Sequence, residues 1–83
     1  MSFVIVVYRS REVSVRVYNK LVALGETCAL VSTPRAAGVG CGLSVKMRAD
    51  TYRKYMSALA QTETFVGFFV VRQTARGQTV TRL

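Results

Sequence analysis

The residues with the clearest potential for chemistry lie in the segment STPRAAGVGCG, residues 32–42. Cysteine is the residue of interest there, because its thiolate is a strong nucleophile. Cys41 lies between Gly40 and Gly42, so its sulfur has little steric cover and nearby amides favour an anion. Arg35, six residues earlier, could fold back across the segment and lower the pKa of the Cys41 thiol.

The same segment also has a purely structural interpretation. Pro34 disfavours helix at Thr33, and the glycines permit backbone angles closed to other residues, so the segment predicts a long connection between two strands. Unusually long loops in small domains are often functional. From the residues alone, a reactive Cys41 and a passive loop cysteine both remain open. Cys28 lies in an apolar strand pattern, and we expect it to be buried and inert.

Composition limits the classes of function. The 83 residues suffice for one compact domain, and an apolar fraction of 51% indicates a packed core. Two cysteines are too few for a disulfide framework, and without histidine we expect no zinc site and no histidine-based catalysis. No apolar run reaches the ~20 residues of a membrane helix. The N-terminus lacks the features of a signal peptide, so we expect a cytoplasmic protein that does not bind membranes.

Charge gives a weaker indication. Twelve basic and four acidic residues give a net charge of +8, which attracts polyanions such as nucleic acids or acidic protein surfaces. The basic residues are spread along the chain, so a solvated surface explains them at least as well.

Hydrophobic periodicity predicts the order strand, helix, strand, strand, helix, strand. Residues 2–9 indicate a central strand buried on both faces, and Ser10 is expected to cap a helix that Gly25 ends, with an apolar stripe of Val13, Val17, Leu21 and Leu24. Further strands are expected over residues 26–32, 43–48 and 63–73, and a second helix over 51–61 with Asp50 as its cap. In residues 43–48, we expect Leu43, Val45 and Met47 to face the core and Ser44 to lie on the half-exposed side.

This order predicts an α/β (α+β) fold, a ferredoxin-like βαββαβ sandwich in which a four-stranded antiparallel sheet carries two helices on one face. We expect a single domain over residues 1–72. Residues 73–83 are polar and basic, and we expect them to form a loosely held tail.

Residues 33–47 resemble the signature of a small family described as selenium or sulfur carrier protein-like. That family shows a threonine-proline-arginine triplet, five further residues and a cysteine-glycine pair. Here the triplet is Thr33, Pro34 and Arg35, and the pair is Cys41 and Gly42. The resemblance extends to about residue 72, although residues 38–40 stand where the family usually has serines.

The resemblance implies that Cys41 is a carrier thiol rather than an enzyme's catalytic residue. It would accept sulfur or selenium from a donor persulfide or perselenide, such as that of a cysteine desulfurase, and present it to an acceptor protein. Arg35 would stabilise the charge, Gly40 and Gly42 would provide clearance and amides, and Thr33 and Pro34 would shape the loop. No cofactor is required.

The sequence also allows two functions other than that of a carrier. Residues 66–71, VGFFVV, faintly resemble the aromatic strand of an RNA recognition motif, although we expect Phe65 and Phe69 to share a face opposite Phe68. The other alternative is a non-catalytic assembly domain that forms a homodimer through its open sheet face, which becomes the main alternative if Cys41 is buried.

Overall fold

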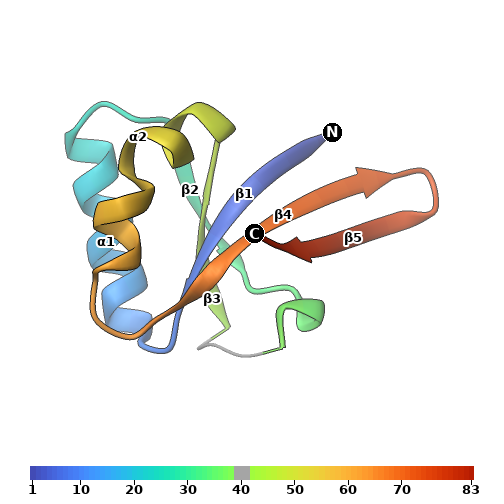
Figure 1. Cartoon of the computed structure of the whole chain (residues 1–83), viewed down its shortest axis with the longest axis horizontal. Coiled ribbons are helices and arrows are strands. Elements are labelled where there is room, and N and C mark those ends of the chain that lie inside the picture. The colour runs from blue at the N-terminus through green and yellow to red at the C-terminus, as the bar shows by residue number, and fades with distance from the viewer. Residues whose placement is uncertain (39–41) are drawn as a thin grey trace.

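The computed structural model describes residues 1–38 and 42–83, which form an α+β fold of two helices and a five-stranded antiparallel sheet (Figure 1). The elements in chain order are β1 (Ser2–Tyr8), α1 (Arg11–Ala23), β2 (Cys28–Ser32), the 3-10 turn η1 (Arg35–Ala37), β3 (Leu43–Met47), α2 (Ala49–Ala60), β4 (Phe65–Thr74) and β5 (Gly77–Arg82). The strand order is β2-β3-β1-β4-β5. Both helices lie on the same side of the sheet. Within the described residues, neither helix has the length and apolarity needed to cross a membrane.

The predicted α+β class is confirmed, but the prediction of four strands is wrong. The fifth strand comes from residues 73–83, which we expected to form a loose tail: β5 pairs with β4 from Phe69 opposite Arg82 to Thr74 opposite Gly77. Gly77, with a φ of 126°, permits the turn between these two strands. Only Val80 of β5 packs on the core. β5 is an edge strand with mostly exposed side chains. Its sequence is therefore mostly polar and lacks the apolar pattern from which a strand is predicted.

The central strand β1 is buried on both of its faces, as its sequence predicts. It pairs with β3 on one side and with β4 on the other. Val4, Val6 and Tyr8 pack into the core under the helices, whereas Ile5 and Val7 pack on the opposite side of the sheet. None of these five side chains is more than 5% exposed. Each face of β1 therefore needs a cover of its own.

The helices cover the first face. Ser10 caps α1 as predicted, because its hydroxyl accepts a hydrogen bond from the Val13 amide at 3.3 Å. Buried Val13, Val17 and Leu21 confirm the predicted stripe, but Leu24 is 54% exposed because α1 ends at Ala23. Asp50 is not the cap of α2. Arg48 holds that position, and Asp50 lies in the first turn.

The second face is covered by η1 and by long basic side chains rather than by a helix. Ala37 of η1 packs with Ile5, Val7, Phe69 and Val71, and β5 lies against η1. The Lys46 ammonium lies 4.4 Å from the centre of the Phe3 ring. The fifth strand therefore helps to hold the connection that contains Cys41.

Arg82 of β5 covers another part of the same face, over β4. Its guanidinium lies 5.4 Å from the centre of the Phe69 ring and donates a hydrogen bond to the Val66 carbonyl at 2.7 Å. Gly67 makes room for this contact, because a Cβ atom there would come within 2.9 Å of Arg82 Nη2. The basic C-terminal segment thus has a structural role in the sheet.

The phenylalanines of β4 are not distributed between the two faces of the sheet as predicted. A register shift between Val7 and Tyr8 turns Phe65 to the helix side, where its ring centre lies 5.0 Å from that of Phe68. The prediction that Phe65 and Phe69 share a face was therefore wrong. Phe68 and Phe69 are 9% and 5% exposed, so β4 does not present them for base stacking.

A carboxylate joins the end of α1 to the start of α2. Glu26 accepts hydrogen bonds from the Thr51 hydroxyl at 3.1 Å, the Lys54 ammonium at 3.0 Å and the Tyr55 hydroxyl at 3.1 Å. The Lys54 contact lowers the pKa of Glu26, and the two hydroxyls lower it further against the opposing effect of partial burial. A carboxyl whose pKa is lowered by folding stabilises the fold while it is ionised.

We predict that Glu26→Gln lowers the melting temperature at neutral pH and that the difference from the parent protein narrows in acid. The stabilisation by Glu26 is present above the ordinary glutamate pKa of about 4.3 and is lost as the pH falls through the lower folded-state pKa. Thermal unfolding of both proteins from pH 7 to pH ~2.5 measures this difference in melting temperature. The matched control is Glu63→Gln, which removes an exposed ion pair with Arg16 and should have little effect. A constant difference for Glu26→Gln at every pH would contradict the prediction.

Candidate functional site

The candidate site is the connection between β2 and β3, and its two ends are joined by hydrogen bonds. The Thr33 amide donates to the Gly42 carbonyl at 2.9 Å, so the chain leaves and re-enters the sheet at neighbouring points. The Thr33 and Ser44 hydroxyls lie 2.6 Å apart and form a second bond. We call Thr33, Gly42, Leu43 and Ser44 the loop stem.

The loop stem is also tied to α1. The Ser14 hydroxyl donates to the Leu43 carbonyl at 3.0 Å and lies 3.4 Å from the Ser10 carbonyl. Both Ser14 and Ser44 are completely buried, so these bonds form where water does not compete. The stem is consequently held by the sheet and by the first turn of a helix.

The first half of the loop is a short 3-10 turn. Pro34 has a φ of −59° and η1 follows it, with the Ala37 amide donating to the Pro34 carbonyl at 3.0 Å. Gly38 ends the turn at a φ of 82°, and Gly42 enters β3 at a φ of 86°. Side chains other than glycine rarely adopt such angles, so both glycines are needed for the path of the chain. Ala37 anchors this half in the core under β5.

The structure places four of the six predicted site residues. Thr33 and Gly42 meet at the stem, while Pro34 and Arg35 begin the turn next to it, with Arg35 exposed. Gly40 and Cys41 lie outside the described residues. Proximity of Arg35 to the Cys41 sulfur therefore stays a prediction.

The other cysteine has the surroundings of a structural residue. Cys28 begins β2, the end of that strand remote from Thr33, and its sulfur lies 3.9 Å from the Tyr18 carbonyl. Burial raises the pKa of the Cys28 thiol, and the charge of Glu26 raises it further. Cys28 is half-buried rather than fully buried, but its raised pKa agrees with the predicted inertness because it lowers the thiolate fraction.

Sequence reasoning missed three residues that support the loop, namely Ser14, Ala37 and Ser44. Ser44 was expected on a half-exposed face and is completely buried, where it bonds to Thr33. Ser14 lies beside the apolar stripe of α1, and a serine next to such a stripe is a weak signal for a buried hydroxyl. Val45 and Met47 face the helices as predicted, whereas Leu43 is only half-buried.

Comparison with known families matches residues 3–66 to the family described as "Putative Se/S carrier protein-like". The match covers most of the 83 residues, including the whole loop and its stem, and ends within β4. The chain therefore belongs to this family of Se/S carrier-like proteins. Comparisons with curated proteins and with solved structures found no match.

We predict that Thr33→Val destabilises the protein more than Ser44→Ala does. The valine leaves the completely buried Ser44 hydroxyl without its Thr33 partner, which costs about 1–3 kcal/mol in the free energy of unfolding. Ser44→Ala leaves the unpaired group on Thr33, which is only half-buried and can bind water, at a cost of about 1 kcal/mol. Urea denaturation measures both.

The double variant Thr33→Val with Ser44→Ala is the matched control. It should be less destabilised than the sum of the single variants, because the second change removes the group that the first left unpaired. Additive losses would show that the two hydroxyls do not interact.

Proposed function

We propose that this protein is a sulfur or selenium carrier that uses the thiolate of Cys41 as its acceptor atom. Membership of the Se/S carrier-like family supports the class of cargo. The observation that carries the assignment to Cys41 is the loop stem: the residue after Cys41 is Gly42, whose carbonyl is held by the Thr33 amide at 2.9 Å. A carrier thiol next to a fixed point of the sheet can be presented to two partners in turn without a change of fold.

The transfer step conserves atoms and electrons. The Cys41 thiolate attacks the outer sulfur of a donor persulfide, R–S–SH, and forms a new S–S bond as the donor's S–S bond breaks. The donor leaves as the thiolate R–S⁻, and Cys41 becomes a persulfide that keeps the outer hydrogen. An acceptor nucleophile then attacks that outer sulfur and releases the Cys41 thiolate. A perselenide donor passes on selenium in the same way.

The charges around the loop favour this chemistry. Arg35 begins the turn at the base of the loop and is exposed, so its guanidinium is available to a thiolate or to an approaching anionic group. Described residues 1–38 and 42–83 provide no ion-pair partner for it. The two cysteines thus have different roles, because the Cys28 thiol is half-buried near Glu26, whose negative charge opposes ionisation.

The partners that we propose are a donor protein, such as a cysteine desulfurase, and an acceptor protein. A net charge of +8 suits docking on acidic surfaces, and such docking weakens as salt increases. We place this exchange in the cytoplasm, where thiols stay reduced.

The test is sulfur loading by a cysteine desulfurase and cysteine, followed by mass spectrometry of the intact protein and its peptides. We expect one added sulfur atom, on the Cys41 peptide. Cys41→Ser should abolish loading, and the matched variant Cys28→Ser should load as the parent protein does. Loading on Cys28, or none on either cysteine with an active desulfurase, would overturn the proposal.

A further inference from the structure

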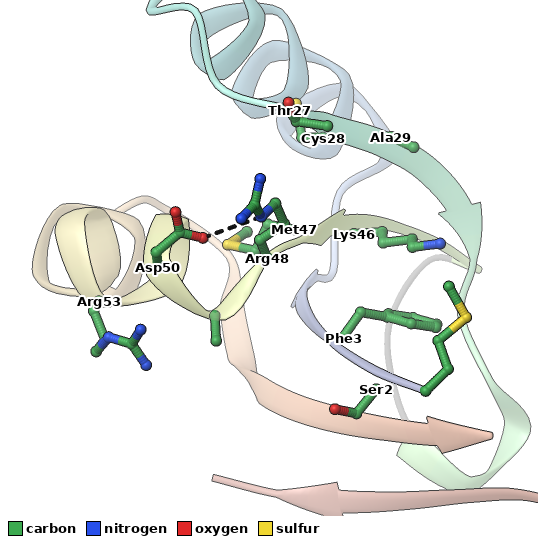
Figure 2. Close-up of a pocket in the computed structure, with 12 residues that line it drawn as sticks. Ser2, Phe3, Thr27, Cys28, Ala29, Lys46, Met47, Arg48, Asp50 and Arg53 are labelled. Atoms are coloured by element: carbon green, nitrogen blue, oxygen red, sulfur yellow. Dashed lines mark ion pairs between the residues drawn. The ribbon is translucent and has the colours of Figure 1, made fainter. Parts of the chain in front are cut away.

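We propose that the end of the sheet remote from the loop stem holds a second site, which binds a small aromatic or apolar phosphomonoester. A cavity of about 660 Å³ lies where the starts of β1 and β2, the end of β3 and the first turn of α2 meet (Figure 2). Its volume falls within the range of about 300–1,000 Å³ that is typical of small-ligand sites. The carrier chemistry of Cys41 does not use it.

The charged side chains around this cavity are predominantly basic. Lys46 of β3, Arg48 before α2 and Arg53 of α2 line it, and Asp50 is the acidic residue among its lining side chains. These four side chains sum to a charge of about +2 at neutral pH. The excess of positive charge favours an anionic ligand, and a phosphomonoester is close to a dianion at that pH.

Two of the cations keep their full charge for a ligand, because no described carboxylate pairs with them. Asp50 pairs with Arg48 at 3.4 Å, which Figure 2 marks with a dashed line. Among described residues 1–38 and 42–83, neither Lys46 nor Arg53 takes part in an ion pair. Figure 2 shows Arg53 on the α2 side of the cavity and Lys46 beside Phe3 on the opposite side. The summed positive charge of the two sides attracts an anionic ligand into the cavity.

The rest of the lining is apolar. Phe3, Ala29 and Met47 contribute to the cavity wall together with Cys28. The Phe3 ring is half-buried, and the Lys46 ammonium lies 4.4 Å from its centre, so an apolar surface and a cation lie side by side. Inorganic phosphate has no apolar group that could cover this wall, so the wall would stay exposed to water. A ligand that joins a ring or hydrocarbon to a phosphate uses both parts.

The position of the cavity separates it from the carrier site. Cys28 and Met47 are paired at the end of β2 and β3 that borders the cavity, whereas Ser32 and Leu43 are paired at the end that borders the loop. The four steps along β2 correspond to about 13 Å. Binding at the cavity and sulfur loading at Cys41 can consequently be measured independently.

The experiment is a titration of the full chain with phenyl phosphate at low salt, followed by amide chemical shifts in NMR. We expect saturable shifts at residues 3, 29 and 46–53, and weaker binding of inorganic phosphate and of neutral benzyl alcohol. Lys46→Gln and Arg53→Gln should each weaken phenyl phosphate binding at least 5-fold, about 1 kcal/mol each. The matched control is Arg11→Gln, because Arg11 is an exposed residue of α1 outside the cavity lining; this variant should bind as the parent protein does.

Several results would overturn the proposal. These are the absence of saturable shifts, shifts outside the cavity, equal affinity for inorganic and phenyl phosphate, or an equal loss in Arg11→Gln. Cys41→Ser should bind phenyl phosphate normally, so the outcome does not depend on the carrier function. Tighter binding of single-stranded RNA that phenyl phosphate cannot displace would also contradict a small-molecule site.

Discussion

The structure depends on one constraint, the burial of β1 on both faces. Val4, Val6 and Tyr8 require a cover on one side, and Ile5 and Val7 require another. At about 1.5–3 kcal/mol for each buried aliphatic side chain, neither face can be left to water in a chain of this size. The two helices cover the first face. Neither α1 nor α2 lies over the second face, so that cover comes from Ala37 of η1, from β5 and from the long side chains of Lys46 and Arg82.

The role of η1 in covering the second face explains why the connection between β2 and β3 is longer than a hairpin needs. Its first half, through Ala37, is part of the core, and its ends are joined at the stem by Thr33, Gly42 and Ser44. Cys41 falls after the part that packs and just before the stem closes. The family match covers this arrangement but stops within β4. In this chain, β5 therefore adds support to the loop from beyond the region that the family model matches.

Much of the fold was predictable because its signals are local. The apolar run of β1, the Ser10 cap and the glycine after α1 depend on neighbouring residues, and the structure confirms them.

The predictions were wrong where contacts between distant parts of the chain determine the structure. β5 is polar apart from Val80 and is stabilised by pairing with β4, and Phe65 changes face because the register between β1 and β4 shifts. Ser44 is buried and forms a hydrogen bond with Thr33, and an alternating strand pattern does not predict such a bond. For the site, the sequence singled out the loop with Thr33, Pro34, Arg35 and Gly42. It missed Ser14, Ala37 and Ser44, which support the loop through contacts with distant parts of the chain.

The proposed function requires that the Cys41 thiol is accessible as a nucleophile, whereas Cys28 packs against the core. The most direct measurement is the rate of alkylation of each cysteine in the native protein as a function of pH, with both peptides quantified by mass spectrometry. We predict that Cys41 reacts faster than Cys28 at neutral pH and reaches its maximum rate at a lower pH, while Cys28 reacts fully only after denaturation. A Cys41 that stays unlabelled until the protein unfolds, or that reacts no faster than Cys28, would contradict it.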